Sequence, residues 1–154
     1  MLRISRLTDY ATVILSVLAL EPERVHTAAA VAGRTRIAAP TASKLLKQLH
    51  RAALVTSSRG VRGGYQLARP ASEISAAAIL EALDGPLALT GCAAGHGHCG
   101  IEATCRVGRG WQRLNLAIRR SLCDVSLAEL AGLDAALARA PIASTKERTL
   151  NDHE

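Results

Sequence analysis

A helix pattern led by proline and followed at once by a glycine-rich hairpin pattern restricts the fold of this chain more than any other feature. Pro40 suits the first turn of a helix, because its ring fixes φ and no amide hydrogen is needed there. From there to about Arg51, apolar and polar side chains recur on opposite helical faces. The inward set is Ala42, Leu45, Leu46 and Leu49, and the outward set is Thr41, Ser43, Lys44, Lys47 and Gln48. The segment therefore predicts a surface helix with a polar, basic outer face.

Two helical segments precede this one. Residues 6 to 20 have the apolar spacing of an amphipathic helix that ends at the turn around Pro22. Thr27 is placed to cap a short helix over 28 to 32, and Gly33 is expected to stop it in a left-handed conformation. A short helix, a turn and a helix with a polar outer face form the helix-turn-helix arrangement.

The hairpin pattern comes directly after the third helix. Residues 54 to 56 and 65 to 67 read as short strands, and SSRGVRGG between them contains three glycines that permit positive φ. Arg59 and Arg62 are expected at its tip. We predict a wing, and the fold class is mainly α with a small β-hairpin: a winged helix-turn-helix plus a C-terminal dimerisation helix.

Positive charge is concentrated in this half of the chain. Residues 1 to 75 carry eleven Lys and Arg against four Asp and Glu, whereas residues 76 to 154 carry eight against nine. Between Arg24 and Arg69 there are nine basic residues and no carboxylate. Such a segment suits a polyanion, because each cation that meets a phosphate releases counterions. Double-stranded DNA is the expected partner, with a merely solvated basic face as the alternative.

The C-terminal half predicts three more helices. Ser75 can cap one that ends at Gly85, a second covers about 109 to 122, and Ser126 with Glu129 forms a capping box for a last one. The first is expected to point Ile79, Leu80 and Leu83 inward, the second carries the stripe Trp111, Leu114, Ile118 and Leu122, and the last runs through Leu130, Leu133 and Leu137. Because helix-turn-helix proteins usually bind DNA as two-fold dimers, the stripe is the predicted homodimer surface. Core within one chain is the alternative.

Between these helices lies a loop that contains Cys92, Cys99 and Cys105. Two glycines and two histidines separate the first two cysteines, which favours a bending loop with soft ligands. The loop lacks the closely spaced cysteine pairs of zinc ribbons and ferredoxins, so spacing alone leaves zinc, an iron-sulfur cluster and thiol redox chemistry open. Cys123 is expected to be a buried free thiol, with a redox role as the alternative.

The N-terminus has a basic start and an apolar run, as a secretory signal does, but Asp9 and Tyr10 interrupt it. No apolar run is long enough to span a bilayer, so we expect a cytoplasmic protein without a membrane partner. The sequence pattern links no nucleophile to a base, so we expect that the protein is not an enzyme and has no small-molecule substrate. The expected organisation is a DNA-binding domain over 1–85, a cysteine-rich loop over 86–106, dimerisation and C-terminal helices over 107–139, and a flexible tail over 140–154.

The segments MLRISRLTDYATVILSVLA, SKLLKQLHRAALVTSSRGVRGGYQLARP and ISAAAILEALDGPL resemble the IscR/NsrR-type winged-helix transcription regulators. The resemblance covers nearly all of residues 1 to 135. The LTDY opening and the WQRLN helix are most similar to regulators of the SUF iron-sulfur assembly system. The resemblance implies a homodimer that binds operator DNA and carries an iron-sulfur cluster in each subunit, 2Fe-2S first and 4Fe-4S as the alternative.

The resemblance also implies roles for particular residues. The cluster thiolates match Cys92, Cys99 and Cys105, and the wing arginine that enters the minor groove matches Arg59. Thr41 and Ser43 stand where many members have tyrosine and glutamate, so base preferences do not transfer. Gly108 stands where some members have a histidine ligand, and the fourth ligand stays open among Asp9, His96, His98, Glu102, water and a small thiol. Of these, Asp9 and His98 are the first candidates.

Together these features predict an iron-sulfur cluster-sensing transcription regulator of SUF genes, whose cluster state tunes operator affinity. A nitric-oxide or redox-sensing repressor of the same family and a zinc-stabilised DNA-binding regulator are the alternatives. A cluster scaffold or electron carrier with an acidic protein partner is a further class.

Overall fold

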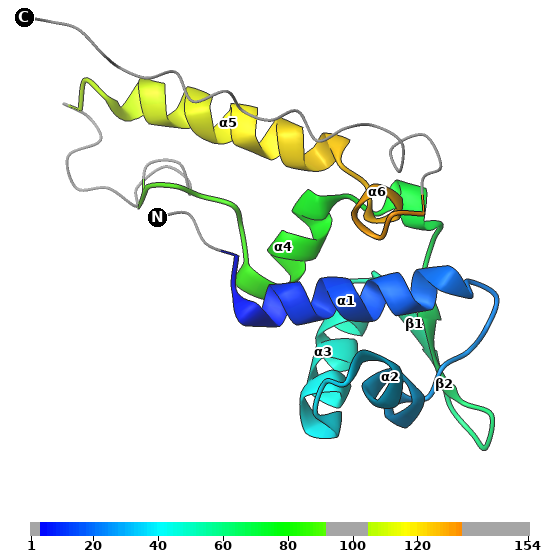
Figure 1. Cartoon of the computed structure of the whole chain (residues 1–154). Coiled ribbons are helices and arrows are strands. Elements are labelled where there is room, and N and C mark those ends of the chain that lie inside the picture. Colours follow the sequence, from blue (N-terminus) through cyan, green and yellow to red (C-terminus); the bar gives the residue numbers. More distant parts are fainter. Residues whose placement is uncertain (1–3, 92–104, 134–154) are drawn as a thin grey trace, which may run out of the picture.

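The computed structural model describes residues 4–91 and 105–133, and within them it is a helical protein with one small sheet (Figure 1). The elements are α1 (Arg6–Leu20), α2 (Ala28–Thr35), α3 (Ala39–Arg51), β1 (Val55–Ser58), β2 (Gly64–Leu67), the 3₁₀ helix η1 (Ala71–Glu73), α4 (Ala76–Asp84), α5 (Gly108–Asp124) and α6 (Leu127–Leu130). Figure 1 shows α2, α3 and the hairpin on one side of α1, with α4 and the long α5 on the other. The predicted mainly helical fold with a small β-hairpin is confirmed.

An aliphatic core joins α1, α2 and α3 to α4 and α6. Helix α1 begins after Ser5, whose hydroxyl accepts a hydrogen bond from the Thr8 amide, and it buries Ile14, Leu15 and Leu18. The four residues expected to point inward from α3 are all buried. Leu127 of α6 belongs to the same core, so the chain returns from α5 to pack on its N-terminal unit.

The end of α2 differs from the sequence-based expectation. Thr27 caps the helix as predicted, by accepting a hydrogen bond from Ala30. Gly33, however, is an ordinary helical residue, and the left-handed residue is Arg36 at φ 57°. The side chain of Thr35 explains the later stop, because its hydroxyl donates to Val31 and accepts from the amide of Ile37.

The hairpin pairs β1 with β2 in antiparallel register, from Val55 opposite Leu67 to Ser58 opposite Gly64. Gly60 has φ 109°, which disfavours other residues at this point of the turn. A Cβ on Gly64 would lie 2.4 Å from the carbonyl oxygen of His26, so this position requires glycine for close backbone approach. The wing is thus fixed both by its own turn and by the segment that precedes α2.

The later helices match the prediction at their starts more closely than at their ends. The Ser75 cap and the capping box of Ser126 with Glu129 are confirmed, and Gly85 ends α4 at φ 82°. The last helix is shorter than predicted, because α6 ends at Leu130 and Gly132 then turns at φ 66°. Leu133, which the predicted helix included, lies beyond α6 and is exposed, and Leu137 lies outside the described residues. Within 4–91 and 105–133, no helix has the length and apolarity to cross a membrane.

Candidate functional site

The outer face of α3 presents the polar side chains that the sequence predicted. Lys44 and Lys47 are exposed, whereas Thr41 and Ser43 are half-buried. A shallow hollow of about 380 Å³ runs along the helix and is lined by Pro40, Ser43, Lys44, Lys47, Gln48 and Arg51. The helix therefore offers hydroxyl, amide and ammonium groups on one surface, the types of group that contact bases and phosphates.

The wing adds two more cations beside this helix. Arg59 and Arg62 are both exposed, and Val61 between them is fully exposed. Neither arginine forms an ion pair within the described part of the chain. Both guanidinium groups are consequently free to meet a polyanion.

In the described part of the N-terminal half, the arginines that form ion pairs all do so with one carboxylate, that of Glu21. Glu21 Oε2 lies 2.8 Å from Arg34 Nη1 and 3.2 Å from Arg24 Nη1. The hydrogen bond from Arg34 is the main cause of a lowered pKa at Glu21, although partial desolvation opposes it. Arg6 on α1 and Arg69 after β2 form no ion pair among the described residues. The other cations without one are Arg36, Lys44, Lys47, Arg51, Arg59 and Arg62. They lie in the turn before α3, on α3 and on the wing.

Arg36 was missed by the sequence reasoning, which placed the turn at Gly33. Its exposed side chain lies in the turn between α2 and α3. No sequence signal marked this turn, because a left-handed arginine is rare and the Thr35 side chain that supports it can serve other roles. Arg36 therefore extends the candidate surface beyond the predicted residues.

Two histidines connect the wing to the helices. The backbone amides of His26 and Tyr65 each donate 2.8 Å hydrogen bonds to the other's carbonyl, so the segment before α2 forms an isolated bridge with β2. The buried His26 ring has Nε2 3.5 Å from Glu21 Oε2 without hydrogen-bond geometry. His50 Nδ1 lies 3.1 Å from the Val55 carbonyl oxygen at the end of α3. These contacts hold the wing in a fixed relation to α3.

Helix α5 buries none of its residues. Ile118 and Leu122, from the predicted stripe, line a cavity of about 720 Å³ with Asn115, Leu80 and residues 84–89. Trp111 and Leu114, from the same stripe, have 42% and 45% of their surface exposed. The stripe thus splits into a part that contacts this chain and a part that faces outward.

The described residues include only part of the predicted metal site. Cys92, Cys99, His96, His98 and Glu102 lie outside them. Cys105 is half-buried three residues ahead of α5, and a Cβ on Gly108 would lie 3.8 Å from its Sγ. Within 4–91 and 105–133, no three His, Cys, Asp or Glu residues form a group that could hold a metal ion.

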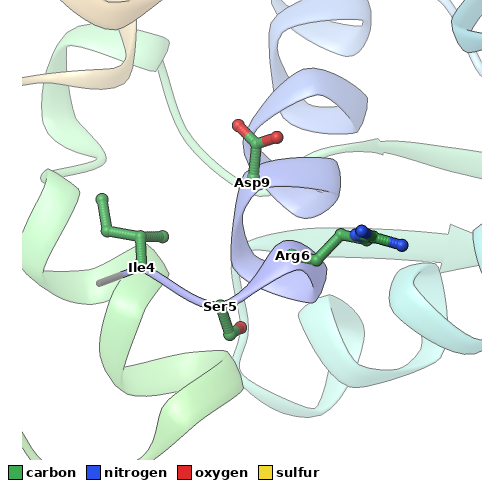
Figure 2. Close-up of a pocket in the computed structure, with 4 residues that line it drawn as sticks. All are labelled: Ile4, Ser5, Arg6 and Asp9. Carbon is green, nitrogen blue, oxygen red and sulfur yellow. The ribbon is translucent and has the colours of Figure 1, made fainter.

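Asp9 lies on the first turn of α1 beside a surface pocket that Ile4, Ser5 and Arg6 also line (Figure 2). Its exposed carboxylate points away from the Arg6 side chain in this view. Across the described ranges, that carboxylate has no ion pair. Three thiols and a carboxylate, the donor types that the sequence predicts for this site, suit an iron-sulfur cluster and also suit zinc.

The prediction that Cys123 is buried is wrong, because its side chain is exposed. The preceding residue, Leu122, lines the cavity. Successive side chains along a helix point in directions about 100° apart around its axis. Cys123 therefore lies outside the surface that contacts α4.

A winged helix-turn-helix with unpaired cations on the second helix of the motif and on the wing defines a DNA-binding transcription regulator. The Rrf2 family model, described as an iron-dependent transcriptional regulator, matches residues 4–132. The chain belongs to the Rrf2 family of transcriptional regulators. It is accordingly a regulator and not an enzyme.

Relatives of known sequence agree with this assignment. The chain is 33% identical over 134 residues to the HTH-type transcriptional regulator IscR of Cereibacter sphaeroides, covering 84% of this chain and 86% of that protein. A protein of Synechocystis sp. named as an HTH-type transcriptional regulator is 40% identical over 87 residues, which is 56% of this chain. The matched part spans 59% of the Synechocystis protein's length.

Solved structures share the fold. The global cysteine regulator CymR of B. subtilis superposes with a TM-score of 0.66 at 26% identity, covering 86% of this chain and 98% of CymR. The IscR structure of T. potens gives a TM-score of 0.65 at 23% identity, over 91% and 93% of the two chains. The winged-helix architecture is therefore confirmed.

Proposed function

We propose that this chain is an iron-sulfur-dependent regulator that binds operator DNA as a homodimer and controls genes of iron-sulfur cluster assembly, the SUF system. Three findings support the proposal: the family description as iron-dependent, the similarity to a protein named IscR, and the three-cysteine loop between α4 and α5. We place its action in the cytoplasm, where operator DNA is found.

The observation that carries the proposal is the group of six cations without ion pairs on the α2–α3 turn, α3 and the wing. In our proposal the outer face of α3 enters the major groove, where Thr41 and Ser43 contact base edges and Lys44 and Lys47 contact phosphates. Arg59 enters the minor groove, and Arg62 meets the adjacent backbone. Two subunits would neutralise about six to ten phosphates, so affinity should fall steeply with salt.

Dimerisation is proposed to use α5. Trp111 and Leu114 expose apolar surface on one side of the helix, and Ile118 and Leu122 extend the same stripe into the cavity beside 84–89. A second α5 packed along this stripe would bury Trp111 and Leu114. Such burial is favourable, because aromatic residues are enriched at the buried centres of protein interfaces. The dimer would also set the distance between two α3 helices.

Cys92, Cys99 and Cys105 would hold the cluster, a 2Fe-2S cluster in our proposal, with Asp9 or His98 as the fourth ligand. A carboxylate or imidazole among three thiolates would give one corner of the site a harder ligand. When bound, such a cluster supplies a centre that oxidants or nitric oxide attack. Binding or loss of the cluster would change the order of the cysteine loop, and this change would reach the N-terminal end of α5, which follows the loop in the sequence.

The proposal is tested by anaerobic purification, followed by the visible absorption spectrum and by counts of iron, sulfide and zinc per chain. The probe for DNA binding is a duplex selected from a random pool by the wild-type protein, titrated at two salt concentrations. We expect iron with sulfide and an affinity that falls with salt. A colourless protein with one zinc per chain would support the zinc-stabilised regulator instead. Cluster without saturable DNA binding would support a scaffold.

A further inference from the structure

A short connector, residues 85–89, leads from the end of α4 toward Cys92 in the sequence. The connector begins at Gly85, whose φ of 82° and ψ of −169° are unfavourable for residues other than glycine. Pro86 follows and has no amide hydrogen to donate. Among residues 4–91 and 105–133, the backbone–backbone hydrogen bond of this connector runs from the Gly85 amide to the Glu81 carbonyl oxygen, so neighbouring side chains help to hold the rest of it.

One side chain of α5 holds the far end of the connector. Asn115 Oδ1 accepts a 3.2 Å hydrogen bond from the amide of Leu89, and Nδ2 donates a 3.1 Å hydrogen bond to the carbonyl oxygen of Leu87. The amide group thus pairs with the backbone as a neighbouring strand would. Both hydrogen bonds are partly buried and join residues 26 and 28 positions apart in the sequence.

A second side-chain contact holds the near end of the connector. The hydroxyl of Thr8, a buried residue in the first turn of α1, donates a 2.7 Å hydrogen bond to Asp84 Oδ2 at the end of α4. Thr8 also receives support from Ser5, whose Oγ lies 3.0 Å from Thr8 Oγ1. The connector is therefore held at one end by the DNA-binding unit and at the other by α5.

We propose that Asn115 is a positioning residue that couples the ligation state of the cysteine loop to the DNA-binding half. This inference rests on the proposed function and names the contact through which it works. A change at Cys92 is transmitted to residues 87–89, which Asn115 holds against α5 and which Asp84 and Thr8 connect to α1. Coupling between distant sites requires such a physical link whose position both sites influence.

The test compares Asn115→Leu with wild type, because leucine keeps the side-chain size and removes both hydrogen bonds. Ser121→Ala is the matched control, since the Ser121 hydroxyl donates only within α5, to the Ala117 carbonyl oxygen. The first measurement is hydrogen exchange of the cluster-free proteins over peptides that contain Leu89. We expect exchange of this amide to rise about tenfold or more in N115L and to stay at the wild-type rate in S121A.

The second measurement is the ratio of operator dissociation constants between cluster-free and cluster-containing protein, using the selected duplex. We expect N115L to bring this ratio at least about tenfold closer to one, while iron and sulfide per chain stay at the wild-type value. The S121A ratio should equal that of wild type. Thr8→Val, which removes the other hydrogen bond, should lower the ratio as well, and the double variant should lower it no further. T8V keeps the test available if N115L fails to fold.

The outcomes separate the two proposals. A wild-type ratio of one would overturn the proposed sensing function and this inference with it. A wild-type ratio far from one that N115L and T8V both leave unchanged would overturn the inference alone. Unchanged exchange at Leu89 in N115L would also contradict it, because the hydrogen bond would then not hold the connector.

Discussion

Helices α1 and α5 are both amphipathic and of similar length, with 15 and 17 residues, yet they differ completely in burial. Helix α1 buries five residues in the core of its own chain, whereas α5 buries none. Since tertiary packing supplies most of a helix's stability, α1 is complete within one chain. In the homodimer proposed above, a second copy would supply the corresponding packing for α5, so that each subunit would combine a self-sufficient half with a half completed by its partner.

The largest expected effect is on the free energy of unfolding and concerns the buried helix, α1. Leu15→Ala removes a fully buried side chain of α1 and leaves a cavity, so the free energy of unfolding should fall by about 2–5 kcal/mol. Urea denaturation measures it. Leu116→Ala, on a half-exposed position of α5, should change the same free energy by less than about 0.5 kcal/mol. Equal losses at the two positions would mean that α5 is packed as α1 is.

The next effect concerns association rather than folding. Trp111→Ala should raise the dimer dissociation constant by about 30-fold or more, because central aromatic residues contribute about 2 kcal/mol or more at interfaces. Sedimentation equilibrium measures the constant. Leu116→Ala is the control, since Leu116 lies off the stripe and is 52% exposed. If both variants associate as wild type does, the stripe is not the dimer surface.

A third prediction sharpens the comparison inside the N-terminal half, between paired and unpaired cations. Arg59→Ala should weaken binding of the selected duplex by about 1–3 kcal/mol, because an arginine in a groove loses its contacts to the DNA. Mobility-shift titration measures it. Arg24→Ala removes an arginine whose charge already lies beside Glu21, and it should leave affinity nearly unchanged. The reverse order of effects would contradict the assignment of the wing.

The smallest effect is in α2, where Gly33 proved to be an ordinary helical residue. A Cβ there meets no atom within 4 Å, so Gly33→Ala should raise the free energy of unfolding by about 0.5–1 kcal/mol. Gly64→Ala should lower it instead, because its Cβ would collide with the His26 carbonyl oxygen. Thermal denaturation of both variants gives the two signs. A loss of stability in G33A would show that this position needs a special conformation.

The sequence predicted well where local chemistry determines structure. The inward face of α3 follows from apolar spacing, and the Thr27, Ser75 and Ser126 caps follow from hydroxyls placed before helical segments. These features depend on residues three or four positions apart. Stop signals were less reliable, since the Thr35 side chain extends α2 past Gly33.

Contacts between distant segments could not be predicted from spacing. The carboxylate of Glu21 pairs with Arg34, on α2, only because α1 and α2 meet, and this removes one arginine from the cations that lack an ion pair. The Asn115 contacts likewise depend on how the connector passes α5. For the same reason the prediction that Cys123 is buried was wrong, because the orientation of the helix, and not composition, decides which side chains are exposed.

The central claim is that three cysteines hold an iron-sulfur cluster whose presence alters operator affinity. The direct measurement is the pair of dissociation constants for the selected duplex, cluster-containing against cluster-free, in wild type and in the variant with Cys92, Cys99 and Cys105 all replaced by serine. We predict that the wild-type constants differ by about tenfold or more, and that the variant has one constant whatever the iron and oxygen conditions. Identical wild-type constants, or the same difference in the serine variant, would contradict the account.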